Sequence, residues 1–217
     1  MKKKKEVVSK TESKLDKETA EDLAKEATKD HSLLHGILDG VYSSHANVKF
    51  KCAKALSIIS KNEPRMLYPK FDFFIDLLDG ESKVLKWNAI DVVANLASVD
   101  VNKRFEKIFE KFYSLLHEGS LITAAHVVGN SGVIVNAQPN LESRITSELL
   151  KVENLELPTD ECRNVLLGHT IVSLDQYFDE IQNKVEVISL VRRQLNNSRK
   201  ATKVKAEEFL RKHYISP

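Results

Sequence analysis

The sequence is poor in cysteine, proline and glycine. Its 217 residues include two cysteines, five prolines and seven glycines. Cys52 and Cys162 are more than a hundred residues apart, and no metal-ligand spacing surrounds either of them. A disulfide framework and a structural zinc site are therefore not expected. Two free thiols indicate a reducing compartment.

Long hydrophobic runs are also lacking. No stretch approaches the roughly 20 consecutive apolar residues that a membrane helix needs. The basic start, MKKKKEVVSKTESKLDKE, is not followed by the apolar run of a secretory signal. With 42% hydrophobic and 29% charged residues, the composition is that of a soluble globular protein. We expect the protein in the cytoplasm, with no membrane as a partner.

Motifs that carry chemistry are missing as well. The sequence has no glycine-rich phosphate loop, no nucleophile elbow, no paired catalytic carboxylates and no cysteine cluster. Enzymes need such groups at defined spacings. The sequence therefore predicts a protein that is not an enzyme and that has no cofactor.

The charge is unevenly distributed, although the formal net charge is only +2. Residues 31–183 carry fifteen basic and twenty acidic residues, whereas residues 184–217 carry nine basic and three acidic ones. The chain thus combines a mildly acidic body with a basic C-terminal end. This basic end suits an acidic partner or nucleic acid, and it equally suits the polar outer face of a terminal repeat.

The most informative feature that the sequence does contain is helical periodicity. In residues 83–98, KVLKWNAIDVVANLAS, non-polar residues recur at spacings of four, three and four. They are Leu85, Ala89, Val92 and Leu96. This spacing places them on one side of an α-helix. The small Ala89 lets a neighbouring helix approach closely.

The same pattern is repeated along the chain. Residues 87–96 align without a gap with residues 122–131, so that a small residue, a valine pair and an asparagine coincide. The equivalent positions are Ala53, Ala89, Ala124, Val165 and Ala206, separated by 36, 35, 41 and 41 residues. A drifting period of this length is typical of two-helix solenoid repeats. We therefore predict an all-α protein, an α-solenoid of about five stacked helical hairpins.

Each predicted hairpin has an outer and an inner helix. The outer helices are expected at residues 15–40, 66–78, 101–117, 139–150 and 175–195, and the inner helices at 47–60, 83–98, 120–136, 160–174 and 199–213. Ser120 and Thr159 are placed to cap two inner helices, and Pro139 fits the first turn of an outer helix. Residues 1–14 are expected to form a disordered Lys- and Glu-rich tail, followed by a single solenoid domain over residues 15–217.

The inner helices resemble those of HEAT repeats, to which armadillo repeats are related. Residues 84–96, VLKWNAIDVVANL, are similar to the HEAT pattern in which an apolar and a basic residue precede alanine, an aliphatic residue and an Ala-Asn or Gly-Asn pair. Asn95 and Asn130 resemble the asparagine with which peptide-binding armadillo proteins hold an extended peptide. Those proteins have tryptophan four residues earlier, whereas this chain has Asp91 and His126 there, so binding of the importin type is not expected.

We expect the inner helices to form a concave surface that binds another protein or a peptide. The side chains expected to line this surface are Lys51, Trp87, Asp91, Asn95, His126 and Asn130. Trp87 and Asp91 lie one helical turn apart on a face that the buried residues do not use. In the alternative interpretation, Trp87 packs between repeats, Asp91 is only solvated and the asparagines bond to neighbouring helices. The protein is expected to be a monomeric scaffold or a regulatory subunit of a larger enzyme.

A second interpretation is a nucleic-acid-binding or DNA-repair protein. The DNA glycosylases built from HEAT-like repeats use tryptophan and aspartate at the spacing of Trp87 and Asp91, together with an arginine that this chain lacks on the equivalent face. The residues that this interpretation assigns to nucleic acid are Arg192, Arg193, Arg199, Lys200 and Lys203. The pair His117-Glu118 resembles those that bind two irons in deoxyhypusine hydroxylase, but that site needs several such pairs, so no metal is expected.

Overall fold

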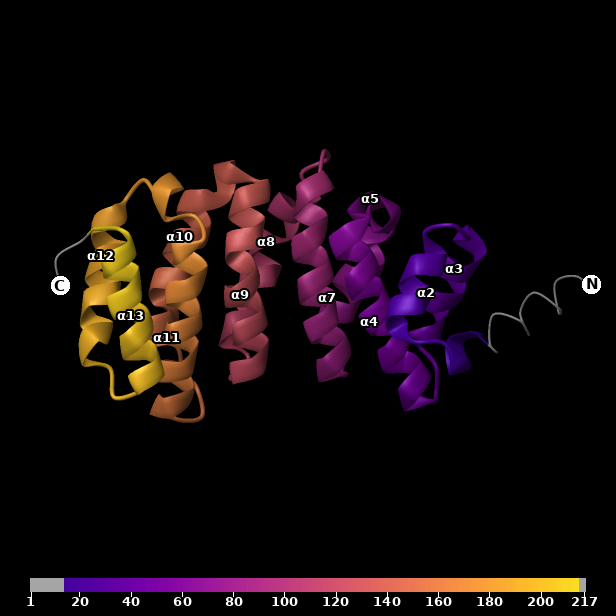
Figure 1. Cartoon of the computed structure of the whole chain (residues 1–217), viewed down its shortest axis with the longest axis horizontal. Helices are drawn as coiled ribbons and strands as arrows, with labels where there is room; N and C mark the ends of the chain where they lie inside the picture. The colour runs from indigo at the N-terminus through magenta and orange to yellow at the C-terminus, as the bar shows by residue number, and fades with distance from the viewer. Residues whose placement is uncertain (1–13, 215–217) are drawn as a thin grey trace, which may run out of the picture. The chain divides into compact units, whose positions relative to one another are not determined.

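A computed structural model describes residues 14–214, which contain twelve α-helices, seven short 3-10 helices and no β-strand (Figure 1). The described chain forms two compact units, one that ends at Asp100 and one that begins at Val101. The predicted all-α fold class is confirmed. Nowhere in residues 14–214 is a helix both long and apolar enough to cross a bilayer.

Two of the domain predictions are not tested by these residues. The tail predicted over residues 1–14 lies outside the described residues except for Lys14. The prediction of one solenoid domain over residues 15–217 stays a prediction.

The first unit is a set of helical hairpins packed around α4. Its helices are α2 (Ala20–Ala27), α3 (His31–Gly40), α4 (Ala46–Asn62), α5 (Pro64–Leu67), α6 (Phe71–Leu78) and α7 (Lys83–Leu96), with 3-10 turns at Tyr68–Lys70 and Ala97–Val99. Helix α4 packs against α2, α3 and α7, and α6 packs against α7. The inner helices predicted at residues 47–60 and 83–98 are therefore α4 and α7.

The outer helix predicted over residues 15–40 is instead divided into α2 and α3. The Asp30 carboxylate accepts a hydrogen bond from the backbone N–H of Ser32 at 2.9 Å, so it caps α3. An aspartate in this position stabilises a helix start more than a helix interior. The chain therefore ends one helix at Ala27 and begins another at His31.

The second outer helix is also interrupted. Pro64 begins α5, and Pro69 lies within the 3-10 turn Tyr68–Lys70 that separates α5 from α6. A proline has no N–H to donate and fixes φ, so it favours a helix start or a tight turn over a helix interior. The Tyr68 hydroxyl donates to Asp100 Oδ1 at 2.6 Å, which ties this turn to the end of the unit.

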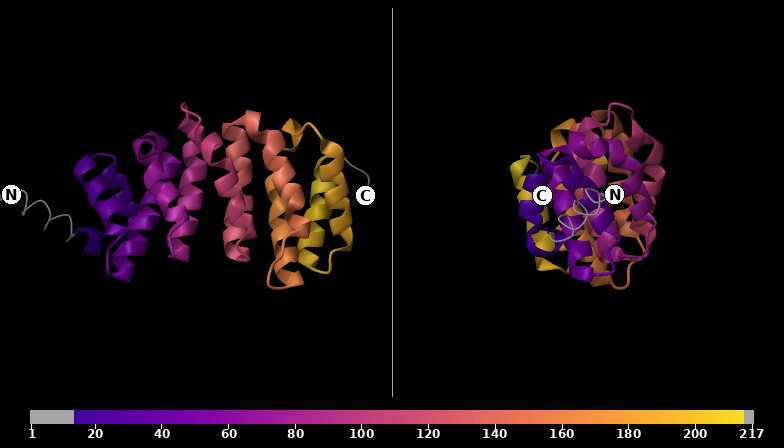
Figure 2. Two further views of the ribbon diagram at one scale, coloured as in Figure 1. Left: turned by 180° about the vertical axis from the view of Figure 1, so that it is seen from behind. Right: turned by 90° about the vertical axis from the view of Figure 1, so that its right-hand side faces the viewer.

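The second unit contains six α-helices in three hairpins (Figures 1 and 2). They are α8 (Arg104–Ser114), α9 (Leu121–Ala137), α10 (Glu142–Leu150), α11 (Asp160–Asp175), α12 (Lys184–Arg193) and α13 (Lys200–Lys212), with 3-10 turns at Leu115–His117, Pro139–Leu141, Lys151–Asn154, Phe178–Glu180 and Gln194–Asn196. Helix α11 packs against α9 on one side and α13 on the other, so the three predicted inner helices are neighbours.

The predicted caps of α9 and α11 are confirmed. Ser120 Oγ accepts from the N–H of Thr123 at 3.3 Å, and Thr159 Oγ1 accepts from the N–H of Cys162 at 3.1 Å. The last outer helix is shorter than predicted, because the 3-10 turn Phe178–Glu180 precedes α12.

The buried face predicted for α7 is confirmed. Leu85, Ala89, Val92 and Leu96 are all buried. The equivalent alanines on α4, α9 and α13 are buried too, whereas Val165 on α11 is half-buried. In the second unit the core continues through the outer helix α8, whose buried side chains are Phe105, Phe109, Phe112 and Tyr113.

Two glycines allow the inner helices of the second unit to approach closely. The N–H of Gly132 on α9 donates to Ser173 Oγ on α11 at 3.2 Å. A Cβ at Gly168 on α11 would lie 2.8 Å from Thr202 Oγ1 on α13, closer than real side chains allow. Helices α11 and α13 therefore approach each other closely at Gly168.

Candidate partner-binding surface

The predicted residues of the first unit lie on two adjacent helices. Trp87, Asp91 and Asn95 occupy successive turns of α7 and are half-buried. The spacing of four residues places them on one face, which the buried residues of α7 do not use. Lys51 lies on α4, which packs against α7.

Two of these side chains already bind other parts of the unit. The ammonium of Lys51 donates to the carbonyl oxygens of Leu15 at 3.0 Å and Asp16 at 2.7 Å. The amide of Asn95 donates to Ser60 Oγ on α4 at 2.9 Å. These contacts stabilise the unit.

His126 and Asn130 lie on α9 in the second unit and are half-buried. The amide of Asn130 donates to the carbonyl oxygen of His126 at 2.8 Å, within its own helix. The hydrogen bonds of Asn95 and Asn130 agree with the interpretation that these amides serve the protein itself.

A second group of side chains on α9, α11 and α13 was not singled out from the sequence. Four large aliphatic residues are exposed there, with exposed fractions between 37% and 49%. They are Ile122 and Val133 on α9, Val172 on α11 and Val204 on α13. We call these four side chains the aliphatic face.

Helical periodicity shows that these residues share one side of their helices. On α9 the positions Ile122, His126, Gly129 and Val133 recur at spacings of four, three and four. On α11 the corresponding positions are Val165, His169, Val172 and Gln176, with the same spacings. Such a series occupies one side of a helix. All eight residues are exposed or half-buried, so this side is open on both helices.

His126 lies on the same side of α9 as Ile122 and Val133, but the exposure of Val133, Val172 and Val204 was not predicted. In the sequence, an exposed valine cannot be distinguished from a buried one nearby. Which of the two is exposed depends on how the neighbouring helices pack. The available signal was the absence of charge, because α9 contains no Asp, Glu, Lys or Arg in its 17 residues.

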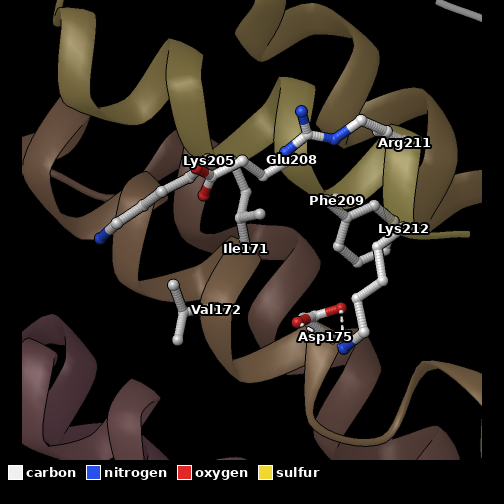
Figure 3. Close-up of a pocket in the computed structure, with 8 residues that line it drawn as sticks. All are labelled: Ile171, Val172, Asp175, Lys205, Glu208, Phe209, Arg211 and Lys212. Carbon is white, nitrogen blue, oxygen red and sulfur yellow. Dashed lines mark hydrogen bonds and ion pairs between the residues drawn. The ribbon is translucent and has the colours of Figure 1, made fainter.

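A pocket of about 310 Å³ lies between α11 and α13 (Figure 3). Its buried apolar side chains are Ile171 and Phe209. At its edge Lys212 Nζ donates to both carboxylate oxygens of Asp175 at 2.9 Å, and His213 Nε2 lies 2.7 Å from Asp175 Oδ1. The carboxylate at this edge is therefore already bound by two side chains of the chain itself.

Several basic residues of the C-terminal end have acidic partners in the preceding hairpin. Arg193 binds Glu153, with Nε at 3.2 Å from both carboxylate oxygens, and Arg199 binds Glu161. Such pairs reduce the positive potential that would attract phosphate groups. Lys200 and Lys203 are exposed. Contact of this end with nucleic acid stays a prediction.

Metal ligands do not cluster in residues 14–214. No three His, Cys, Asp or Glu side chains of this range come together in a group that suits a metal ion. His117 and Glu118 lie at the end of the 3-10 turn after α8 and are exposed.

Comparison with solved structures reveals the same architecture in repeat proteins. A designed armadillo repeat protein, YIII(Dq.V1)4CPAF in complex with peptide (KR)4, matches with a TM-score of 0.55 and 14% identity over 94% of this chain and 90% of that chain. The chain has an armadillo-like α-solenoid fold. A second designed armadillo repeat protein, YIII(Dq)4CqI, matches with a TM-score of 0.47 and 14% identity over 87% of this chain and 84% of that chain. No family model and no curated protein matches the sequence.

Proposed function

We propose that this armadillo-like solenoid is a non-enzymatic scaffold whose inner helices bind a protein segment or peptide. The observation that carries the proposal is the aliphatic face. Single exposed aliphatic residues are common on protein surfaces, whereas a group of them on adjacent helices is typical of a surface that a partner covers.

The structural neighbour with a TM-score of 0.55 supports a peptide or protein segment as the ligand. That protein is described in complex with a peptide. We propose that the present chain, which shares this fold, also binds a peptide or protein segment.

The first unit contributes a separate surface to the proposal. Trp87 and Asp91 share the open face of α7. An indole supplies a large apolar contact area, and tryptophan is enriched at the centre of protein interfaces. We propose that they contact a partner as well.

Capture of partners by the full-length tagged chain in its own cells, with crosslinking and mass spectrometry, tests the proposal. We expect a reproducible partner for the native chain. The double variant Val172→Asp and Val204→Asp should lose it, because a carboxylate in an apolar interface carries a large desolvation cost. Val185 on the outer helix α12 is 72% exposed, so Val185→Asp is the matched control.

Two outcomes would contradict the proposal. If Val185→Asp reduced capture as strongly as the double variant, or if no partner were recovered, the aliphatic face would not be a binding surface. The variant Trp87→Ala tests the first unit in the same way, and unchanged capture would exclude Trp87 from the interface.

A further inference from the structure

A lysine that has no acidic partner among residues 14–214 lies beside the aliphatic face. Lys205 on α13 is half-buried and extends toward α11 (Figure 3). A Cβ at Gly168 would lie 3.5 Å from Cδ and from Nζ of Lys205. Because Gly168 has no side chain, the lysine lies close to the backbone of α11. Within the described part of the chain, Lys205 makes no hydrogen bond or ion pair.

The charge of Lys205 acts on the same side of α11. Burial of the ring lowers the pKa of His169, and the positive charges of Lys205 and Arg199 lower it further. His169 belongs to the series of α11 that includes Val172. The ammonium of Lys205 therefore lies near the side of α11 that carries Val172.

The acidic groups nearby do not cancel this charge. Glu161 is bound by Arg199, and Asp175 is bound by Lys212 and His213. Glu208 follows Lys205 by three residues on α13 but makes no ion pair with it. Helix α9, on the other side of α11, carries no charged residue. Glu208 and Arg211 line the same pocket as Lys205 and Val172. Lys205 is thus a cation that lies beside an exposed aliphatic group and forms no ion pair with any carboxylate of residues 14–214.

We infer that the aliphatic face binds a protein segment in which aliphatic and acidic side chains are interspersed, with a carboxylate of that segment bound by Lys205. This inference rests on the proposed function and specifies the partner's chemistry. The aliphatic side chains of such a segment would cover Val133, Val172 and Val204. A carboxylate beside Lys205 would gain a charge-assisted hydrogen bond in a partly desolvated place.

The same features favour a protein segment over nucleic acid. Single-stranded nucleic acid is held by aromatic stacking and by a row of cations along its backbone. The aliphatic face has aliphatic groups in place of aromatic ones. Of the cations near it, Arg199 and Lys212 are bound to carboxylates, and Lys205 and Arg211 remain. Two cations do not form the row of charges that neutralises a phosphate backbone.

Three synthetic twelve-residue peptides test the inference on the full-length protein. One repeats Leu-Asp-Ser, one repeats Leu-Lys-Ser and one repeats Ser-Asp-Ser, each labelled with fluorescein. Fluorescence polarisation at about 50 mM salt keeps electrostatic screening low. We expect the Leu-Asp-Ser peptide to bind at least about tenfold more tightly than either of the others, the effect of one charge-assisted contact.

Two lysine variants assign the site. Lys205→Ala should raise the Kd of the Leu-Asp-Ser peptide about tenfold. Lys203, two residues earlier on α13, is exposed, so Lys203→Ala is the matched control and should leave the Kd unchanged. Circular dichroism of both variants confirms that the helical content is retained.

Several results would overturn the inference. Equal affinity for the acidic and basic peptides would contradict it, and so would equal effects of the two lysine variants. Displacement of the peptide by a 20-nucleotide single-stranded DNA at equimolar concentration would indicate a nucleic-acid site, and a dimer in light scattering that Lys205→Ala dissociates would indicate an interface between two copies of the chain. If the Leu-Asp-Ser peptide did not bind while Val172→Asp with Val204→Asp still abolished capture of a cellular partner, the inference would fail and the proposed function would stand.

Discussion

At the scale of single residues, the two cysteines lie in different environments. Burial raises the pKa of the Cys52 thiol to about 11, despite the opposing effect of Lys51. Cys52 also packs against Gly40, where a Cβ would collide with its sulfur atom. Cys162 is half-buried in the first turn of α11. The two thiols therefore differ in access to solvent and reagents.

We predict that a disulfide reagent at pH 8 modifies one thiol per native chain. Reaction requires the thiolate and access to it, and Cys52 lacks both. Cys162→Ser should remove the fast reaction, whereas Cys52→Ala should retain it. Two equally fast thiols in the native protein would contradict the burial of Cys52.

The Asp175 carboxylate at the end of α11 binds two side chains at the end of α13. Burial alone would raise its pKa, but hydrogen bonds from Lys212 and His213 outweigh burial and lower the pKa below its usual value. A carboxyl group with a lowered pKa in the folded state adds stability above the pKa of the unfolded chain, near 4. That stability is lost as pH falls through the folded pKa.

We predict that Asp175→Asn lowers the free energy of unfolding by about 1 kcal/mol at pH 6, since the ion pair is partly exposed. The difference from the native chain should diminish as the pH falls through the folded pKa, because the native carboxyl becomes protonated too. Urea unfolding at a series of pH values from 6 downward measures this. Asp179→Asn, an exposed residue of the 3-10 turn Phe178–Glu180, is the control, and an equal loss in it would contradict the role of Asp175.

At the scale of elements, buried hydroxyl groups join neighbouring helices. Tyr113 on α8 and Ser131 on α9 are buried, and their oxygens lie 3.0 Å apart. Ser131 Oγ also donates to the carbonyl oxygen of Val127 at 2.9 Å. Burial raises the pKa of Tyr113 far above its usual value, so the phenol stays neutral and needs a hydrogen-bond partner.

We predict that Ser131→Ala lowers the free energy of unfolding by about 1–3 kcal/mol, because it leaves the Tyr113 hydroxyl buried without this partner. Adding Tyr113→Phe should recover part of the loss, which a double-mutant cycle in urea measures. Ser114→Ala changes an exposed serine and should alter stability by less than about 0.5 kcal/mol. Strictly additive effects of Ser131→Ala and Tyr113→Phe would show that the two hydroxyls do not interact.

The inner helices were more predictable from the sequence than the outer ones. Their non-polar periodicity is long, and Ser120 and Thr159 mark two of their starts. The first outer helix divides at Asp30, which caps a new helix, and the second divides at Pro69, which has no N–H to donate. In both cases the helical pattern of the sequence continues on either side of the break. A non-polar pattern alone does not show which local preference prevails.

The candidate site was less predictable than the fold. Trp87 and Asp91 were recognisable because they are unlike their neighbours. Val133 and Val172 were not, because exposure of a valine depends on helices that are distant in the sequence. Lys205 lies close to Gly168 of another helix, and no pattern within α13 indicates this.

At the scale of the whole molecule, an unfolding experiment can show whether the two units unfold together as one domain or independently. We propose a single cooperative domain, because each repeat of a solenoid is stabilised by its neighbours. Trp87 is the only tryptophan of the chain and lies in the first unit. Its fluorescence reports on that unit, whereas circular dichroism at 222 nm reports on all helices.

We therefore predict that the two signals give the same midpoint in urea, which is the test of a two-state transition. Tyr113→Phe, a change in the second unit, should shift both midpoints together. If fluorescence and circular dichroism separated, or if this variant moved only the circular dichroism signal, the units would unfold independently.

Gly168 connects helix packing with ligand preference. A methyl group at this position would alter no charge, yet its carbon would lie 2.8 Å from Thr202 Oγ1, so α11 and α13 would have to shift at the crossing beside Lys205. The proposed ligand preference is thus sensitive to a substitution that neither touches the ligand nor changes the protein's isoelectric point. We expect an exchange of glycine for alanine at this one helix crossing to alter which partners are accepted.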